Sequence, residues 1–167
     1  MGELAAADIL GLDIDLSSCH VKVAELFRYW NSRRPPHGLP GRQHIDPLDV
    51  PRLMPHIWLL DIERQPLRFR YRLVGTELVR AGGRELTGHY MDEIHGKFGQ
   101  SPQAVNYVNL AMTNRPHWRK GSVTFDWDRD HVVVERLILP LCRDGRTADM
   151  ILGISVFFDL NGRELSA

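Results

Sequence analysis

Histidine offers the most chemistry in this sequence, because imidazole can be a metal ligand, a haem ligand or a general base. No H-E-x-x-H motif occurs, and no two histidines lie four apart on a predicted helix, so the sequence predicts no metal site. Most fall in predicted loops or on predicted surfaces, while two flank a short predicted helix and are best placed to hold a ligand, namely His89 and His95. The eight histidines are His20, His37, His44, His56, His89, His95, His117 and His131.

An enzyme would need a nucleophile beside a base, or paired carboxylates. The acidic cluster Asp126, Asp128, Asp130 with His131 is the best candidate. Alternation places Asp126 and Asp128 on the polar face of a strand, and D-R-D-H fits a hairpin turn. We interpret the cluster as a solvated turn and predict no catalytic residue and no enzyme.

A row of arginines, Arg68, Arg70 and Arg72, alternates with apolar residues. Such a row could bind an anionic ligand or partner, or it could pair across strands with acids such as Asp61 and Glu63. Both interpretations stay open at this stage. The pair at residues 82–83, Gly-Gly, lacks the G-K-[ST] ending of a phosphate-binding loop.

Composition excludes several classes of partner. Twenty-one basic and 21 acidic residues balance, so we expect neither nucleic acid nor an anionic membrane as partner. The longest apolar run, residues 150–158, is too short to cross a bilayer. Cys19 and Cys142 are far apart and form no C-x-x-C pair, which favours a reducing, cytoplasmic location over a disulfide framework or a zinc site.

The elements that must position these residues centre on residues 67–94. Phe69, Tyr71 and Leu73 alternate with the arginines, which predicts a strand with one buried face. A short helix follows and must end at the glycines of residues 82–83. A second short helical turn carries Met91.

An amphipathic helix is predicted from residue 18 onward, with apolar residues at helical spacing. Its stripe could pack on the sheet of the same chain, or it could pair with the same helix of a second subunit. We expect a homodimer, with the interface formed by Val23, Leu26, Phe27 and Trp30.

The remaining pattern predicts a short helix after Asp46-Pro47, a strand over residues 58–62, a longer helix over residues 101–114 and three closing strands. Asp144-Gly145 indicates a hairpin between the last two strands. The predicted fold is α+β: a five-stranded antiparallel sheet with short helices on one face and an N-terminal amphipathic helix. We divide the chain into a flexible segment (1–17), a flanking helix and loop (18–45) and a core (46–160).

Three motifs resemble one family. W-x-x-x-R reads here as Trp30 to Arg34, a D-P to L-P segment as residues 46–55, and R-L-x-G-T…L-T-G as residues 72–88. Together they resemble PAS domains, in particular a single-domain branch of bacterial PAS-like proteins, many from alphaproteobacteria. The resemblance covers about residues 25–159, and its motifs are structural.

The resemblance implies a sensory module and allows two cofactors to be examined. Haem-binding PAS domains typically take the iron ligand from the longer helix, and residues 101–114 contain no histidine. Flavin-binding PAS domains carry a cysteine motif near the short helices and amide side chains on the last strands. No cysteine lies between Cys19 and Cys142, and no Asn or Gln lies in residues 132–158, so we expect neither haem nor flavin and no other cofactor.

PAS-like folds form a cavity between the sheet and the short helices, and we expect it to bind a small, largely apolar ligand. Large side chains could equally fill that space. The predicted lining is Phe69, Tyr71, Leu73, Leu78, Met91, Val108, Met112, Phe125, Leu137, Leu152 and Ile154.

These patterns predict a stand-alone sensory or regulatory module that binds a small molecule, a protein partner, or both. It would signal through its N-terminal helix to a separate output protein. One alternative is an interaction scaffold with a filled core. The other is a small enzyme on a cone-shaped α+β fold, which would require Tyr71, His89 or Asp126 to converge in one cleft.

Overall fold

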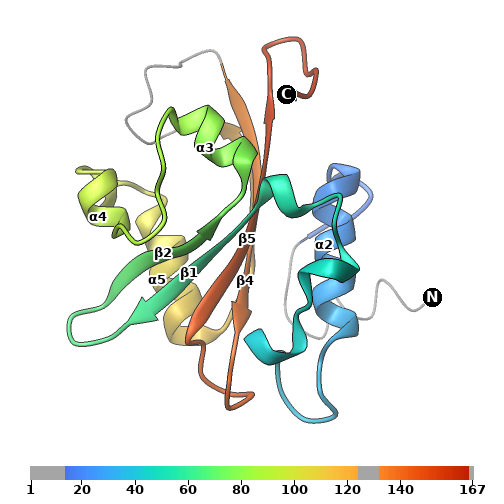
Figure 1. The fold of residues 1–167 in the computed structure, drawn as a ribbon, viewed down its shortest axis with the longest axis vertical. Coiled ribbons are helices and arrows are strands. Elements are labelled where there is room, and N and C mark those ends of the chain that lie inside the picture. The colour runs from blue at the N-terminus through green and yellow to red at the C-terminus, as the bar shows by residue number, and fades with distance from the viewer. Residues whose placement is uncertain (1–13, 124–131, 166–167) are drawn as a thin grey trace.

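A five-stranded antiparallel sheet, in the order β2-β1-β5-β4-β3, forms the centre of the molecule (Figure 1). The computed structural model describes residues 14–123 and 132–165. The fold is the predicted α+β arrangement. The strands are β1 (Ile57–Glu63), β2 (Arg68–Val74), β3 (His117–Ser122), β4 (Val133–Leu141) and β5 (Met150–Phe158).

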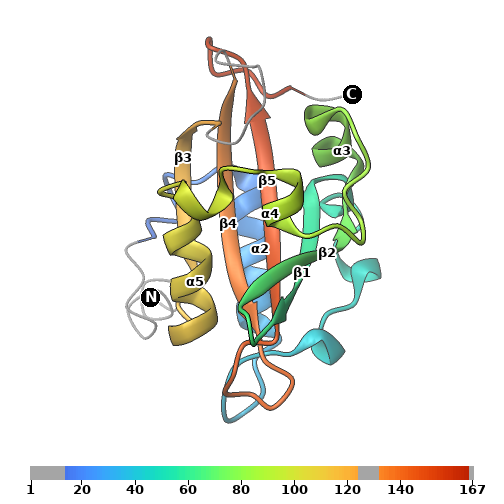
Figure 2. The same cartoon turned by 90° about the vertical axis from the view of Figure 1, so that its left-hand side faces the viewer.

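Helices cover both faces of this sheet. The α-helices are α2 (Val21–Ser32), α3 (Thr76–Gly82), α4 (Met91–Ile94) and α5 (Ala104–Thr113), and the 3-10 helices are η1 (Arg42–His44), η2 (Pro47–Asp49), η3 (Met54–His56) and η4 (Phe98–Gln100). Figure 2 shows α4 and α5 in front of the sheet and α2 behind it. We call the face toward α3, α4 and α5 the inner face and the face toward α2 the outer face.

Alternation along β5 decides which residues meet which layer. Leu152 and Leu26 of α2 line the same small pocket, so the even-numbered residues of β5 face outward, toward α2. Gly153 and Ser155 face inward, where Ser155 accepts a hydrogen bond from the Trp58 indole at 3.0 Å. A Cβ at Gly153 would overlap the Trp58 ring, so the space left by this glycine is filled by the indole.

The apolar stripe of α2 packs on the sheet of its own chain. The four residues expected to form a dimer interface are at most 1% exposed, so the structure contradicts that expectation and supports the alternative of packing within the chain. The helix is capped by the His20 side chain, whose Nδ1 accepts from the Lys22 amide. The buried residues are Val23, Leu26, Phe27 and Trp30.

Both ends of α2 are tied to β4. At the start, the His20 amide donates to Glu135 Oε1 at 2.7 Å. At the end, Trp30 Nε1 donates to the Pro140 carbonyl at 2.9 Å. A displacement of β4 would therefore act on the helix at two points.

The strand and short helices of residues 67–94 and the last hairpin form as predicted. Gly83 ends α3 in the left-handed conformation with φ 71°, and Gly145 turns between β4 and β5 with φ 77°. β3 differs, since it begins at His117, whereas the first of the three closing strands was expected to contain Asp126 and Asp128. The acidic cluster at residues 126–131 and Phe125 lie outside the described residues.

Candidate functional site

A small cavity lies between the inner face of the sheet and the helices that cover it. Its volume is about 40 Å³. It is lined by Trp58, Tyr71, Leu78, His95, Tyr107, Arg119, Val123, Val134, Arg136, Ser155 and Phe157.

Aromatic side chains fill most of the space in which a PAS-like fold would hold a ligand. Tyr107 of α5 is 1% exposed and lies 6.2 Å from Trp58, 5.8 Å from Phe69 and 5.6 Å from Phe98 between ring centroids. Burial raises the pKa of Tyr107. The remaining space suits a very small molecule.

The cavity is more polar than the sequence predicts. Arg136 of β4 is 5% exposed, and one guanidinium nitrogen donates to Gln103 Oε1 at 2.9 Å. Its guanidinium carbon lies 5.1 Å from the centre of the Tyr107 ring, within the range of a cation–π contact. Its Nε is buried and has no hydrogen-bond partner among the described residues.

A second arginine lies directly across from the first, since Arg119 of β3 pairs with Arg136 in the sheet register. Burial, and then the charge of Arg136, lowers the pKa of Arg119. His117, two residues earlier on β3, has its pKa lowered by burial and then by Arg136 and Arg119. The buried Arg136 and the half-buried Arg119 and His117 together make the inner face of β3 and β4 polar and electropositive.

Tyr71 and His95 form the other polar contact in the cavity, with Tyr71 Oη and His95 Nε2 3.2 Å apart. Burial raises the pKa of Tyr71, so this phenol stays protonated at neutral pH. His89 is exposed, and Asp126 lies outside the described residues, so the structure does not assemble the constellation that the enzyme alternative requires.

The predicted lining divides into several groups. Tyr71 and Leu78 line the cavity, and Phe69 and Met91 are buried core residues. The prediction that Leu73, Leu137, Leu152 and Ile154 line the cavity is wrong, because these side chains lie on the outer face of the sheet. Leu73 changes face at an irregularity of register, where Leu59 pairs with Leu73 but Leu60 pairs with Tyr71.

The predicted face of α5 is also wrong. Val108 is 38% exposed and Met112 is 68% exposed. The buried stripe instead contains Ala104, Tyr107 and Ala111. Both stripes have helical spacing and differ by one residue, so periodicity alone could not choose between them.

The cavity residues that the sequence analysis did not predict are Trp58, Tyr107, Arg119, Val123, Val134, Arg136, Ser155 and Phe157. One signal for Arg136 exists in the sequence: Glu135 and Arg136 are adjacent charges inside an otherwise apolar strand, V-V-V-E-R-L-I-L. Because side chains alternate along a strand, Glu135 and Arg136 point to opposite faces of the sheet, and each buried charge needs a partner on its own face.

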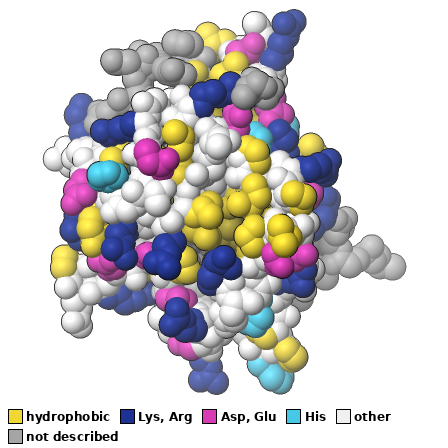
Figure 3. Space-filling view, viewed as in Figure 1, with side chains coloured by type: hydrophobic (Ala, Val, Ile, Leu, Met, Phe, Trp, Pro, Cys, Tyr) yellow, Lys and Arg dark blue, Asp and Glu magenta, His cyan; other side chains and the backbone are white. Residues whose placement is uncertain are grey.

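A larger depression of about 1000 Å³, which we call the outer groove, lies on the other side of the sheet. Its lining includes apolar side chains of the outer face, such as Leu59, Leu73 and Met150. Figure 3 shows hydrophobic side chains gathered near the centre of the face seen in Figure 1, with cationic side chains beside them.

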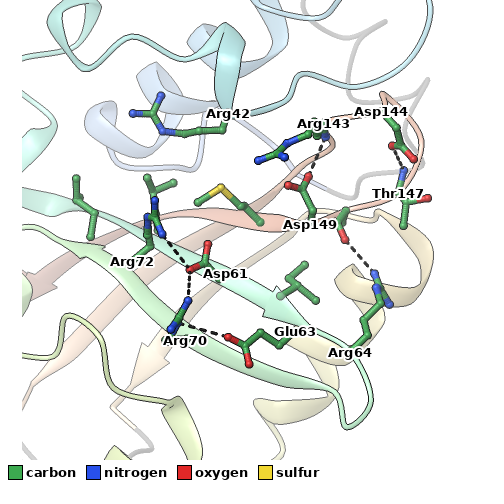
Figure 4. Close-up of a pocket in the computed structure, with 15 residues that line it drawn as sticks. Arg42, Asp61, Glu63, Arg64, Arg70, Arg72, Arg143, Asp144, Thr147 and Asp149 are labelled. Atoms are coloured by element: carbon green, nitrogen blue, oxygen red, sulfur yellow. Dashed lines mark hydrogen bonds and ion pairs between the residues drawn. The ribbon is translucent and has the colours of Figure 1, made fainter.

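Arginines and acids from several segments surround the outer groove (Figure 4). Arg70 lies 3.4 Å from Asp61 and 3.5 Å from Glu63, and Arg72 lies 3.9 Å from Asp61. The predicted pairing across strands is therefore confirmed for two of the three arginines. Arg68 instead binds Asp92 of α4 through two hydrogen bonds, at 2.9 and 2.7 Å.

Other chemistry has little support in the part of the chain that the structure describes. There, no group of three or more His, Cys, Asp or Glu side chains could hold a metal ion. Burial raises the pKa of Cys19 to about 11 and that of Cys142 to about 12, so neither thiol is a thiolate at neutral pH. None of the described helices combines the length and the apolar character that a membrane span needs.

Comparison with known proteins decides the family. A family model described as PAS domain matches residues 19–156, which is most of the chain. The chain belongs to the PAS domain family. A search of curated proteins found no match to it.

Membership of the PAS family has a general functional consequence. PAS domains are typically sensory or regulatory modules without catalytic activity, and the space between sheet and helices is where this PAS domain has its inner cavity. The narrower resemblance, to the bacterial branch that carries the R-L-x-G-T…L-T-G core, stays a prediction.

Proposed function

We propose that this PAS domain senses a small molecule in its inner cavity and transmits occupancy of the cavity to α2. In this account it acts by binding and not by catalysis. A separate protein, which recognises the state of α2, produces the output.

One observation supports this proposal above the others: consecutive residues of β4 connect the cavity to α2. Arg136 faces inward and lines the cavity, whereas Glu135 faces outward and accepts a hydrogen bond from the His20 amide at the start of α2. Glu135 is fully buried, and its Oε1 also accepts from Trp118 Nε1 at 3.1 Å. A ligand that pulls on Arg136 would move the carboxylate that holds the helix.

Buried polar networks favour such coupling because their members have few alternative partners. A carboxylate at a helix N-terminus is also favoured by the helix dipole. A small shift of Glu135 would therefore change the stability of the first turn of α2. The ligand would then act by changing the fraction of molecules in which this turn is formed.

The test is a screen of melting temperature against small neutral, cationic and anionic metabolites, with native mass spectrometry of freshly purified protein. The first variant is Val134→Phe, which fills the cavity, because Val134 is 7% exposed and lines it. The matched control is Val105→Phe on α5, where Val105 is 56% exposed.

We expect at least one compound to raise the melting temperature of the wild type and of the control by a few degrees but not that of Val134→Phe. No bound molecule and no response to any compound would favour the alternative, a scaffold with a filled core. Equal responses in all three proteins would place binding outside the cavity.

A second candidate function is recognition of a protein partner, including a second copy of the chain, in the outer groove. The observation that favours it is the exposure of charge beside an apolar floor, since the Arg72 side chain is 65% exposed. Because the apolar stripe of α2 is buried, a homodimer would need another surface such as this one. The native mass spectrum reports the number of subunits directly.

A further inference from the structure

The inner cavity contains two arginines that form no ion pair with any acidic residue the structure describes, and this feature points to the chemistry of its ligand. Arg119 and Arg136 are direct neighbours on the same face of β3 and β4. Like charges opposite each other in a sheet are destabilising, and burial increases the cost of an unpaired charge. Within residues 14–123 and 132–165, neither arginine forms an ion pair with a carboxylate.

Only some of the N–H donors of the two arginines form hydrogen bonds in the described part of the chain. Arg136 donates to Gln103 and lies against Tyr107, but its buried Nε–H has no acceptor in the described chain. Arg119 donates to the Ser122 carbonyl at 2.9 Å. Each guanidinium has five N–H donors, so donors remain for an anion placed between the two side chains.

Neutral donors stand near these charges. The Ser155 hydroxyl accepts from Trp58, which leaves its own O–H available to donate. His117 lies on the same face of β3, and its Nδ1 is buried without a partner among the described residues. Leu78, Val134 and Phe157 supply apolar lining.

The size of the cavity limits the anion. A volume of about 40 Å³ corresponds to about three times the minimum needed for one water molecule, which is enough for a carboxylate group and little more. Arginine binds a planar carboxylate through two parallel hydrogen bonds. Resting on the function proposed above, we propose that the inner cavity binds a short-chain monocarboxylate, with its carboxylate between Arg136 and Arg119 and its alkyl group against the apolar lining.

The experiment compares acetate and propionate with acetamide and propionamide, which have similar shapes and no charge. Binding is measured by calorimetry and by melting temperature, with sodium chloride keeping the ionic strength constant. The proteins are the wild type, Arg136→Gln and the control Arg52→Gln, which removes an arginine whose side chain is 80% exposed and pairs with Glu25.

We expect the carboxylates, and not the amides, to raise the melting temperature of the wild type and of the control. Affinity for acetate should fall about tenfold or more in Arg136→Gln, because a charge-assisted pair is lost. In case this variant does not fold, the Nε–H signal of Arg136 in the NMR spectrum of the wild type provides a second readout. That signal should shift on titration with acetate and stay unchanged with acetamide.

Equal responses to acetate and acetamide, or undiminished acetate binding by Arg136→Gln, would overturn the assignment of the ligand class. Failure of the ligand class is distinguishable from failure of the proposed function. If acetate has no effect but another compound raises the melting temperature and Val134→Phe blocks it, the cavity is a sensor for a different chemistry. If no compound acts through the cavity, both proposals fail.

Discussion

At the scale of single residues, the proposed function depends on two adjacent charges of β4, Glu135 and Arg136. Glu135 Oε1 accepts from the His20 amide and the Trp118 indole, while its Oε2 lies 3.7 Å from Lys120 Nζ and has no hydrogen-bond partner among the described residues. Arg136 donates to Gln103, and its Nε has no acceptor in the described part of the chain. Burying a charge is costly unless it is paired, so Arg136, which forms no ion pair with a described carboxylate, is available for an anionic ligand.

Two imidazoles, the buried His56 and the half-buried His117, make stability depend on pH. Burial lowers the pKa of His56 and His117 below the ordinary value of 6.5, and the next contributions come from Lys22 at His56 and from Arg136 at His117. Below pH 6.5 the unfolded chain therefore binds more protons than the folded chain. We predict that the urea midpoint of unfolding is lower at pH 5.5 than at pH 7.5.

Replacing both histidines by glutamine should reduce the difference between these two pH values. Glu164, which lies 3.7 Å from His56, has a lowered pKa and titrates below this window. A wild-type midpoint that is equal or higher at pH 5.5, or a double variant that keeps the whole difference, would show that these histidines titrate normally.

The place of Tyr71 in the cavity and the cross-strand pairing of Arg70 and Arg72 could be predicted from the sequence. Arg136 and Arg119 were not predicted, because the apolar residues of the last strands were expected to form the lining. A strand buried on both faces has no polar face that reveals its orientation, so its pattern cannot say which side meets the helices.

The strands and helices themselves were largely predictable. Glycine ends α3, and Asp144-Gly145 turns the last hairpin. What local patterns could not supply was the register change between Leu59 and Leu60, which turns Leu73 to the outer face. Bulges arise from the pairing of two strands and leave a weak signal in either one.

Gly153 of β5 packs directly against the Trp58 indole of β1. We predict that Gly153→Ala lowers the free energy of unfolding by about 1–3 kcal/mol, since a Cβ would overlap the Trp58 indole in a packed interior. Urea unfolding measures this loss. Gly96→Ala is the matched control, because a Cβ at Gly96 meets no atom within 4 Å.

A comparable loss in both glycine variants would mean that backbone conformation and not contact with the indole sets the cost. Because Trp58 also donates to Ser155, displacement of the indole should weaken ligand binding in the cavity together with stability.

At the scale of the whole molecule, the proposed function makes the sheet a divider between a sensing layer and a signalling layer. The inner layer of α3, α4 and α5 closes a small polar cavity, and α2 lies on the opposite face (Figures 1 and 2). β4 contacts both layers, since it bears Arg136 on the inner face and holds α2 through the Glu135 side chain and the Pro140 carbonyl. The family of the fold and the helices on one face were predictable from sequence, but the packing of α2 on the other face and the role of β4 required the structure.

Hydrogen–deuterium exchange with and without a compound that binds the inner cavity tests this account most directly. The measurement is made on wild-type protein and on Glu135→Gln, with Asp61→Asn as the control because Asp61 is an acid of the outer face whose ion pairs are with Arg70 and Arg72 of β2. The account predicts that binding changes the exchange of the first turn of α2 in the wild type and in the control, and that the change is reduced in Glu135→Gln. Protection of the cavity strands with no change in α2 would contradict it.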